Sequence, residues 1–555
     1  MKHSDTYDYV IIGSGFGGSV SAMRLAEKGY SVLVLERGKR FTDEDLPKTN
    51  WDIRKYLWMP ALRCFGILQM SLSRGYFVYH SSGVGGGSLV YAATLMEPNE
   101  DFFSADAWRD LDDWKSTLQP HYETAKRMLG VAPNPRMWPA DEALQSVAED
   151  LGYGDTFRPT EVGIFFGEPG VNVSDPYFGG EGPNRSGCTH CGACIVGCRE
   201  NAKNDLTKNY LYFAEKLGVE ILPEVQAGEI HPLHDEQPDD ARYVVHYHSS
   251  TGFFRKTRAS ARARNVILSA GVLGTLSLLL YCKEELGSLK NLSPRLGELV
   301  RTNSEAFMGA YSQREIEDHS QGLTITSIIY ADEKTQIEPV RFQDGSSLLY
   351  RLLSSPIIDP SDSFLQRLWS TIIEIFKFPR DFINVKFIPG LTRRGIALML
   401  MQTEDNLMQL RRGRNPFTLY RRGLVGEHDV ERTIPVNINL GNRVARLFAE
   451  KIKAHPSGAI TSLLNVPMTA HILGGCVISK TPDEGVIDMD CQVHNYPGLY
   501  VVDGSIVPAN PGVNPSLTIT ALAEYAMSRV PPKNGQTLQP PSGVHHTVEA
   551  APHKS

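Results

Sequence analysis

The sequence predicts an α/β fold, α+β overall, in which a parallel sheet is assembled from segments far apart along the chain. Residues 9–12 form an apolar run that glycines end, residues 17–28 carry helical spacing, and residues 31–35 form a second apolar run. Such a strand–helix–strand unit, which needs about 30 residues, is typical of the start of a parallel sheet. The later strand-like runs that we expect to complete this sheet lie at 219–222, 265–269 and 499–502.

Length, charge and cysteine content exclude several classes of protein. The chain has 555 residues, a net charge of −7 and 21% charged residues, which argues against a disordered chain and against a basic nucleic-acid-binding face. Eight cysteines are too few for a disulfide scaffold at this length. The N-terminus lacks the pattern of a secretory signal, and no run approaches the roughly 20 apolar residues of a membrane span. We expect a cytoplasmic protein, peripheral to a membrane at most, with export by an unseen route as the alternative.

A glycine-rich turn follows the first predicted strand and opens the first predicted helix. Gly13, Gly15 and Gly18 fit the G-x-G-x-x-G pattern. The first glycine allows a tight turn, the second lets the backbone approach a pyrophosphate, and the third lets helix and strand pack closely. Glu36 ends the second strand, where a carboxylate would accept a ribose 2′-hydroxyl and repel a 2′-phosphate. The pattern therefore predicts a dinucleotide site, and the alternative is a turn that serves packing alone.

Two later glycine-rich elements bear on the kind of dinucleotide. They are residues 83–88 and the pair Asp503-Gly504. One G-x-G-x-x-G turn, together with further cofactor contacts from glycine-rich elements later in the chain, is typical of a large cofactor enclosed by the fold. We therefore expect FAD in preference to NAD.

Four stretches, in this order, carry a resemblance to a known family. They are YVIIGSGFGGSVSAMRLAEKGYSVLVLERG, GVGGGSLVYAAT, NVILSAGVLGT, and HILGGCVIS with GLYVVDGSIVPANPGVNPSLTITALAE. Together they resemble the glucose–methanol–choline (GMC) oxidoreductases and, within that family, its cholesterol oxidase-like members. The resemblance spans nearly the whole chain, except the C-terminal tail and parts of 340–465.

The resemblance implies a GMC-type, Rossmann-like FAD domain interleaved with a substrate domain on a mostly antiparallel sheet. The FAD domain would comprise residues 1–45, 78–105, 200–304 and 465–530. The substrate domain would comprise residues 46–77, 106–199 and 305–464. Residues 531–555 are polar and proline-rich, so we expect a disordered tail.

The same resemblance implies the residues that surround the flavin. Beyond the first glycine turn, the cofactor-binding set would be Gly83, Gly85, Gly86, Gly87, Ser88, Val225, Asp503 and Gly504. His471 and Asn514 would stand before the flavin ring, where the alcohol binds. Oxidation of a secondary alcohol removes the hydroxyl proton, which a histidine can accept near neutral pH, and an asparagine amide can orient the hydroxyl. Alternatively, His471 is an ordinary buried histidine, and Asn514 caps the helix that begins near Ser516.

Glu338 is the candidate for a third catalytic group. Cholesterol oxidases use a carboxylate over the sterol rings to shift a double bond after oxidation, and the resemblance places that role at Glu338. A carboxyl buried in an apolar pocket has a raised pKa and can carry a proton. The alternative is a surface glutamate or one paired with Arg341, and the two interpretations remain open.

Four cysteines are spaced as in bacterial ferredoxin loops. Cys188, Cys191, Cys194 and Cys198 follow C-x2-C-x2-C-x3-C, with Arg199 where the usual proline would stand. The segment resembles that of sugar dehydrogenases in the same superfamily, which carry an iron–sulfur cluster and pass electrons onward. An iron–sulfur cluster, a zinc site and reduced cysteines without metal all remain open.

Two apolar stretches could contact a membrane surface or cover an apolar pocket. Residues 51–70 mix aromatic and basic side chains, and residues 364–376 place apolar side chains at helical spacing. An amphipathic stripe more commonly faces the protein core, so we expect both to be core.

We therefore expect FAD-dependent oxidation of the 3β-hydroxyl of a sterol, with oxygen as acceptor and with a 5-ene to 4-ene shift as an open addition. A first alternative is a dehydrogenase of a sterol or other hydrophobic alcohol that passes electrons through the cysteines to a quinone or cytochrome. A second is a flavin/iron–sulfur electron carrier without turnover of an alcohol. None of these needs a nucleic-acid partner.

Overall fold

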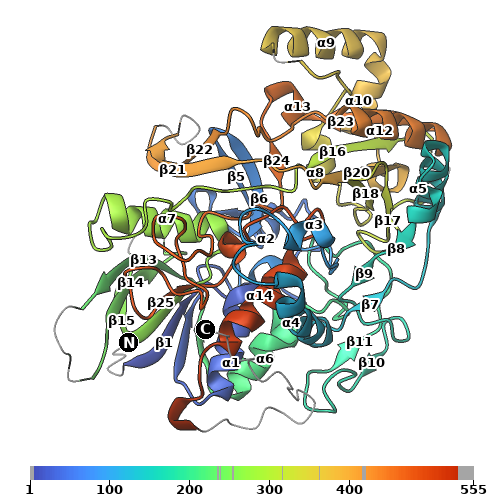
Figure 1. The fold of residues 1–555 in the computed structure, drawn as a ribbon. Helices are drawn as coiled ribbons and strands as arrows, with labels where there is room; N and C mark the ends of the chain where they lie inside the picture. The colour runs from blue at the N-terminus through green and yellow to red at the C-terminus, as the bar shows by residue number, and fades with distance from the viewer. Residues whose placement is uncertain are drawn as a thin grey trace.

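The computed structural model describes residues 6–233, 237, 239–252, 256–314, 317–361, 363–415 and 420–535. Within them the chain builds two large sheets, with helices packed around each (Figure 1). The α/β prediction is confirmed by this arrangement.

The first sheet has the order β12-β2-β1-β15-β14-β13, and β25 pairs with β15. Its strands are β1 (Tyr7–Ile12), β2 (Val32–Leu35), β12 (Glu220–Leu222), β13 (Val225–Pro232), β14 (Tyr243–Ser249), β15 (Arg258–Leu268) and β25 (Leu499–Val501). The pairs β12–β2, β2–β1, β1–β15 and β15–β25 are parallel, while β13 and β14 extend the sheet antiparallel. Distant segments thus complete the parallel part, as the sequence predicts.

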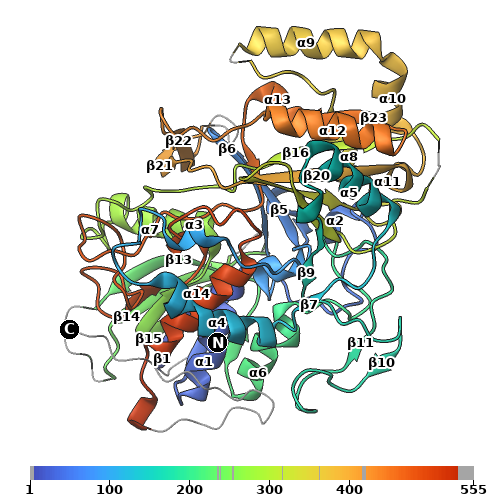
Figure 2. The ribbon, with the colours of Figure 1, turned by 45° about the vertical axis from the view of Figure 1, so that its right-hand side comes forward.

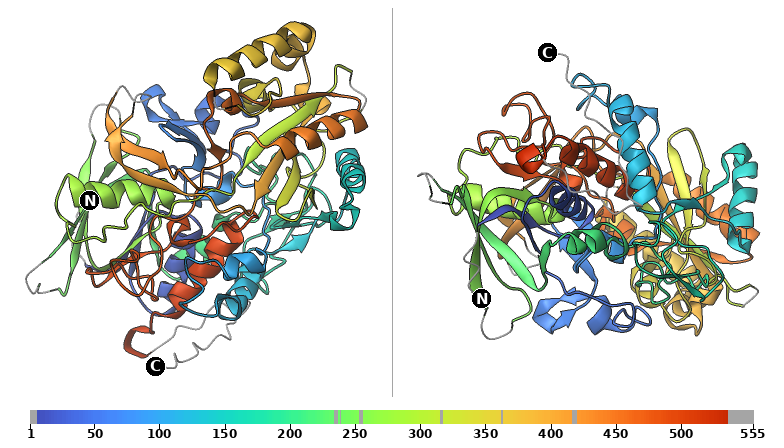
Figure 3. Two further views of the ribbon diagram at one scale, coloured as in Figure 1. Left: turned by 45° about the horizontal axis from the view of Figure 1, so that its top comes forward. Right: turned by 90° about the horizontal axis from the view of Figure 1, so that it is seen from below.

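Helices cover this sheet and share its core. They are α1 (Phe16–Glu27), α4 (Trp114–Met128), α6 (Tyr210–Lys216), α7 (Gly271–Glu284) and α14 (Ser516–Ser528). Helix α1 packs between α6 and α14, and α4 packs on α14 (Figure 3). The structure differs here from the expected domain division, because α4, expected in the substrate domain, buries Trp114, Leu118 and Tyr122 in the same core as β1.

The second sheet is antiparallel in every pair and has the order β19-β23-β16-β20-β18-β17-β8. Its strands are β8 (Arg158–Pro159), β16 (Ala306–Tyr311), β17 (Ser327–Tyr330), β18 (Thr335–Val340), β19 (Ser354–Ser355), β20 (Gly395–Gln402) and β23 (His455–Ala459). Helices α5 (Pro139–Leu151) and α12 (Asn439–Lys451) pack together on it and close a second apolar core (Figure 2).

Smaller elements join the two halves and cover their edges. Strands β5 (Leu68–Ser73), β6 (Tyr76–Ser81) and β24 (Met468–Thr469) form a three-stranded sheet. The two-stranded sheets are β3 (Trp58–Met59) with β4 (Cys64–Phe65), β7 (Ala132–Pro133) with β9 (Glu161–Val162), β10 (Asn172–Val173) with β11 (Arg185–Ser186), and β21 (Met408–Arg414) with β22 (Arg422–His428). The remaining α-helices are α2 (Ile53–Tyr56), α3 (Glu100–Phe103), α8 (Leu348–Leu353), α9 (Phe364–Lys377), α10 (Pro379–Phe387), α11 (Leu391–Arg394) and α13 (Ile460–Leu464).

The structure decides where the two apolar stretches lie. In residues 51–70 the expectation is confirmed only in part, because Tyr56, Trp58 and Leu68 are buried whereas Trp51, Ile53 and Leu62 are exposed. The expectation for residues 364–376 is wrong, because the apolar side of α9 faces outward and Leu365 and Phe376 are mostly exposed. Helical spacing shows that a helix has an apolar face but not which way that face turns.

The beginning of the C-terminal tail is ordered. Residues 531–535 lie against the N-terminal strand and helix, where Lys533 bonds Asp8 through its side chain and the carbonyl of Lys28 through its backbone. The rest of the expected disordered tail lies outside the described residues. In the part of the chain that the structure describes, no helix has both the length and the hydropathy to span a bilayer.

A buried ion-pair network ties α1 to α14. Arg24 contacts Glu524 with Nη2–Oε1 at 2.7 Å and Glu27 with Nη1–Oε2 at 2.9 Å, and Tyr210 donates to the same Glu524 oxygen at 2.6 Å. All four side chains are buried, so each charge depends on its partners for solvation.

We expect Arg24→Met to lower the free energy of unfolding by about 3–5 kcal/mol, because two carboxylates lose their buried counter-charge. Arg40→Met is the matched control, since Arg40 pairs with Glu215 at the surface and the change should cost less than about 1 kcal/mol. Urea denaturation measures both variants, and equal losses would contradict the role given to the buried network.

Candidate active site

One cavity of about 760 Å³ is lined by both large sheets. The carboxyl ends of β1, β2 and β15 contribute Ile12, Leu35 and Ser269, and the antiparallel sheet contributes Phe307 and Met399. In open α/β sheets, ligands bind outside the carboxyl ends of the parallel strands, so this is the expected position for a dinucleotide.

The first glycine turn points the start of α1 into this cavity. Gly13 has φ +101°, and a Cβ there would overlap the carbonyl oxygen of Ser269. Gly15 is the N-cap residue and supplies no side-chain cap, while Gly15, Phe16 and Gly17 line the cavity. The first N–H groups of a twelve-residue helix therefore lie open to a phosphate. Gly18 does not line the cavity, because it packs against the carbonyl of Gly13.

The second glycine segment crosses close to the first. Gly86 has φ +51°, and a Cβ there would collide with the Cα of Gly15. Gly86 and Gly87 line the cavity, whereas Gly83, Gly85 and Ser88 do not. The Ser88 hydroxyl donates to the Gly85 carbonyl at 2.7 Å and accepts from the Leu206 N–H at 3.0 Å, so it holds the loop in shape.

Glu36 directly follows β2 and lines the cavity with its side chain buried. One oxygen accepts from Ser14 N–H at 3.1 Å and hydroxyl at 2.8 Å, and the other accepts from Gly38 N–H at 2.8 Å and Gly83 N–H at 3.3 Å. This carboxylate thus joins the two glycine segments at the position where a ribose would lie.

Three more expected cofactor residues lie along the same wall. Val225, Asp503 and Gly504 all line the cavity, and the Val225 N–H donates to the Glu36 carbonyl at 2.9 Å. Burial raises the pKa of Asp503, although hydrogen bonds from Ser505 and Thr275 lower it. We call the part of the cavity along the ends of β1, β2 and β15 the dinucleotide channel. The open N-terminus of α1 and the two glycine segments on its wall fit a dinucleotide whose pyrophosphate lies at α1.

His471 lies where the dinucleotide channel meets the antiparallel sheet. Its Nδ1 contacts Glu305 Oε1, and the other Glu305 oxygen accepts from the Ala470 N–H at 2.7 Å. Burial acts to lower the pKa of His471, but the Glu305 carboxylate outweighs burial, so the pKa is raised above its ordinary value. The Glu305 contact occupies Nδ1 and leaves Nε2 for a ligand in the cavity that His471 lines.

Asn514 and Glu338 lie beside this imidazole. Asn514 lines the cavity at the start of α14, and its Oδ1 is buried without a hydrogen-bond partner. Burial raises the pKa of Glu338 to about 8, against the opposing effects of His471 and of hydrogen bonds from Asn514 and Gln336. Glu338 Oε2 is likewise buried without a partner in hydrogen-bond geometry. Unsatisfied buried polar atoms on a cavity wall are typical of a site that binds a polar group.

The surface or ion-paired interpretation of Glu338 is wrong. The side chain is fully buried, and Arg341 instead pairs with Asp141 at 2.8 Å. On β18, Glu338 shares a face with Val340, which lines the cavity, although Glu338 itself is covered.

Sequence reasoning missed three members of this cluster. Glu305 orients His471, Asn303 donates to the Val513 carbonyl at 2.8 Å beside that ring, and Gln336 donates to Glu338 Oε1 at 2.9 Å. Gln336 lies two residues before Glu338 on one strand, so strand alternation could have identified it. For Glu305 and Asn303, only the polar run 301–305 before a strand offered a signal.

The four cysteines surround one small apolar cavity of about 20 Å³. Burial raises the pKa of Cys191 to about 11 and raises the pKa of Cys188 and Cys194 as well, which favours the thiol form of these three side chains in the absence of a metal. Tetrahedral zinc with Zn–S bonds of about 2.3 Å needs sulfurs about 3.8 Å apart. The choice between an iron–sulfur cluster, zinc and reduced cysteines without metal therefore stays a prediction.

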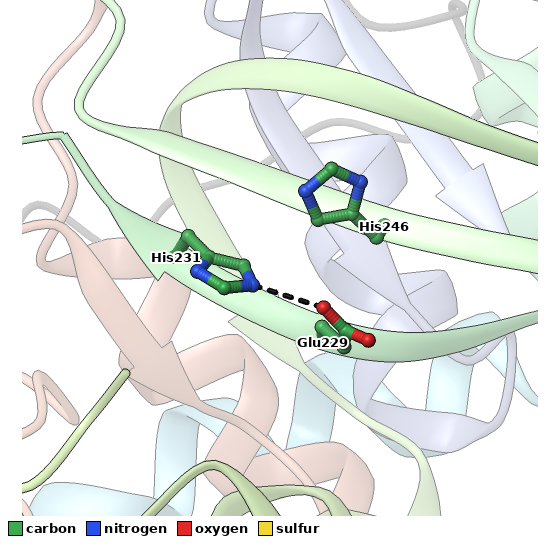
Figure 4. Close-up of side chains that lie close together, drawn as sticks. All are labelled: Glu229, His231 and His246. Atoms are coloured by element: carbon green, nitrogen blue, oxygen red, sulfur yellow. Dashed lines mark hydrogen bonds and ion pairs between the residues drawn. The ribbon is translucent and has the colours of Figure 1, made fainter. Parts of the chain in front are cut away.

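A separate group of metal-binding side chains lies on the outer part of the first sheet. Glu229 and His231 on β13 face His246 on β14, with ligand atoms within 4.8 Å of one another and His231 Nε2 at 3.0 Å from Glu229 Oε2 (Figure 4). The register of β13 shifts between Ala227 and Glu229, and Glu229 is then paired with His246 across the two strands. These groups could hold a divalent cation, but they do not line the cavity.

Comparisons with known proteins agree with this geometry. The family model for GMC oxidoreductases matches residues 182–288 and 443–523, and a model for NAD(P)-binding Rossmann-like domains matches 11–43. The chain is 43% identical to a cholesterol oxidase of Acinetobacter baumannii over 98% of each chain, and 42% identical to one of Mycobacterium tuberculosis over 97% of this chain and 93% of that protein.

Solved structures give the same fold at low sequence identity. Pyridoxine 4-oxidase from Mesorbium loti superimposes with a TM-score of 0.61 at 16% identity, over 94% of this chain and 99% of its own. Because of the full-length similarity to the two bacterial oxidases, the chain belongs to the GMC oxidoreductases and is an FAD-dependent alcohol oxidoreductase.

Proposed function

We propose that this enzyme oxidises the 3β-hydroxyl of a cholesterol-like sterol to the ketone, with oxygen as electron acceptor. The observation that carries the proposal is the cluster of His471, Glu305 and Asn514 at the junction of the dinucleotide channel with an apolar chamber. The two full-length relatives, both cholesterol oxidases, support the choice of substrate.

The chamber beyond His471 suits a rigid apolar ring system. Its wall is formed by aromatic and aliphatic side chains of the antiparallel sheet, of α8 and of the segment between β18 and α8, among them Phe307, Val340, Phe342, Leu349 and Met399. Burial of apolar surface against such a wall stabilises a bound sterol, while the few polar groups fix its hydroxyl end.

FAD, when bound, accepts a hydride from the carbinol carbon. With Nδ1 held by Glu305, His471 Nε2 accepts the hydroxyl proton, directly or through water. The Glu305 carboxylate stabilises the imidazolium that this transfer creates. Asn514 lines the cavity beside this imidazole, and its amide would orient the hydroxyl without adding charge.

Glu338 is suited to the double-bond shift that could follow oxidation. With a pKa raised to about 8, its carboxylate is a stronger base than an ordinary glutamate, and its Oε2 lacks a partner. The base form would remove a proton from C4 of the 5-ene-3-one and return it to C6, which yields the conjugated 4-ene-3-one.

A second candidate function is a dehydrogenase that passes electrons through an iron–sulfur cluster at the four cysteines. Ile195, inside the cysteine loop, lines the main cavity. The buried Lys203 ammonium donates to the carbonyls of Cys194 at 2.7 Å and of Leu89 at 2.9 Å. It therefore joins the cysteine loop to the end of the glycine segment 83–88, which borders the dinucleotide channel. A positive charge there would stabilise a cluster held by four thiolates.

The first test compares flavin reduction by excess cholesterol without oxygen in His471→Gln and Glu305→Gln. His471→Gln should retain its flavin and reduce it about a hundredfold to ten-thousandfold more slowly, because the proton acceptor is lost. In Glu305→Gln the His471 pKa should fall, since its negative neighbour is gone, so the low-pH loss of activity should shift to lower pH. His246→Gln, outside the cavity, is the control, and near-normal reduction in His471→Gln would remove this residue from the mechanism.

The second test concerns Glu338→Gln. Oxidation should be largely retained while the unconjugated 5-ene-3-one accumulates, because an amide cannot carry the proton from C4 to C6. Absorbance of the conjugated ketone measures the outcome, and a 4-ene-3-one product from this variant would defeat the assignment.

The third test separates the two electron acceptors. If the cysteines hold a cluster, anaerobically purified protein should contain iron and labile sulfide, both lost on Cys191→Ser. Cys64→Ser is the matched control, because Cys64 is buried in another part of the molecule. Oxygen consumption with peroxide release on adding cholesterol identifies an oxidase, whereas turnover only with an artificial acceptor, together with iron, identifies the dehydrogenase.

A further inference from the structure

Two histidines and a glutamate come together where the first sheet ends in its edge strand, β13. Glu229 and His231 are two residues apart on β13, so their side chains leave the strand on the same face. His246 on β14 is paired directly with Glu229 in the antiparallel ladder, which places its side chain on that face as well. Figure 4 shows the three side chains together on the two neighbouring strands.

The ligand atoms of this group are close enough to share one cation. All three lie within 4.8 Å of one another, and His231 Nε2 is 3.0 Å from Glu229 Oε2. In tetrahedral zinc, with bonds of about 2.0–2.1 Å to nitrogen or oxygen, neighbouring ligand atoms are about 3.3 Å apart. The pair on β13 is already near that spacing. His246 is exposed, so rotation of its side chain is enough to bring its ring nitrogen to the same ion.

The donor set selects the kind of cation. Two imidazole nitrogens and one carboxylate oxygen are ligands that zinc takes in proteins, with water in the fourth position. Magnesium and calcium are bound by oxygen ligands, so two histidines disfavour both. The carboxylate of Glu229 offsets part of the charge of the ion, and the side chains of His231 and Glu229 are 37% and 40% exposed, so a hydrated ion can reach them.

The basic groups on the same face have partners of their own. Arg262 on β15 is paired with Val244 in the ladder, and its Nε and Nη2 each donate to Asp239 at 2.8 Å. Lys256 contacts His248 Nε2 at 3.3 Å, nearer the end of β14. The Asp239 carboxylate thus compensates the charge of Arg262, and Lys256 lies beside a histidine outside the group.

We propose that Glu229, His231 and His246 form a binding site for one divalent cation of the zinc class, with water as the remaining ligand. The ion joins β13, at the edge of the sheet, to β14. Because the three ligands meet only when the two strands are paired, binding of the ion stabilises the folded hairpin. The site lies outside the active-site cavity, and the proposal does not depend on the proposed function.

The test titrates zinc chloride into the holoenzyme after dialysis against a chelator and removal of the chelator. Calorimetry gives the zinc bound per chain, and absorption at the zinc K edge gives the ligand atoms. Wild-type protein should bind one zinc per chain through nitrogen and oxygen at about 2.0–2.1 Å. His246→Ala should bind zinc at this site about tenfold or more weakly, because one of three protein ligands is lost.

His248→Ala is the matched control. His248 lies two residues further along β14 on the same face, and its Nε2 contacts Lys256 rather than the group. Its loss should leave zinc binding as in wild type. Glu229→Gln is a second variant that retains the size of the side chain and loses its charge, so the proposal stays testable if His246→Ala does not fold.

Hydrogen exchange gives an independent readout of the role of the ion. Zinc should slow the exchange of backbone amides in 225–232 and 243–249 severalfold in wild type and in His248→Ala, because the ion opposes separation of the two strands. It should have no such effect in Glu229→Gln. Equal slowing in Glu229→Gln would contradict the proposed link between the strands.

Four results would overturn the site. They are no zinc bound through nitrogen and oxygen by the wild type, sulfur ligands alone at about 2.3 Å, unchanged affinity in His246→Ala, and equal loss of affinity in His248→Ala. A zinc-dependent dimer with one ion per two chains would also overturn it, since the ion would then lie between copies. None of these readouts uses a sterol or flavin reduction, so failure of the proposed function would leave them unchanged.

Discussion

The Glu36 carboxylate is the interaction on which the cofactor side of this structure depends. Its two oxygens collect N–H groups from Ser14, Gly38 and Gly83, so one buried charge holds three chain segments together at the end of β2. A buried carboxylate is costly unless several donors satisfy it, and here backbone amides do so. The same two glycine segments cross at Gly15 and Gly86, where a Cβ on Gly86 would collide with the Cα of Gly15.

The catalytic cluster of His471, Asn514, Glu338 and Glu305, by contrast, is formed where the two halves of the molecule, each built on one large sheet, meet. His471 and Asn514 come from the C-terminal part that accompanies the parallel sheet, while Glu338 lies on β18 and Glu305 directly precedes β16 of the antiparallel sheet. Two acids and one imidazole buried together cannot all be charged without cost. Burial raises the pKa of Glu338, against the effect of His471, and the Glu305 carboxylate raises the pKa of His471, against the effect of burial. Each half therefore supplies groups whose protonation depends on the other half.

Much of the fold could be predicted from the sequence because its signals are local. The strand–glycine–helix–strand unit, the later strands near 265 and 499, and the glycines at 83–88 all follow from chain neighbours. What could not be predicted depends on distant partners. Glu305 is 166 positions before the histidine it orients, and Arg341 pairs with Asp141 rather than with the adjacent glutamate. The spacing of α9 gives an apolar face, but its outward direction is set by the Arg367 bond to α13.

We propose that the carbon–hydrogen bond at C3 of the sterol is broken in this site as His471 takes the hydroxyl proton. Anaerobic flavin bleaching by 3β-hydroxysterol, with hydrogen or deuterium on C3, tests it most directly. We expect complete bleaching with a 3-ketone as product, and bleaching that is severalfold slower with deuterium. A flavin that stays oxidised with the sterol would contradict this mechanism. So would a bleaching rate that is the same with hydrogen and with deuterium on C3 at every pH.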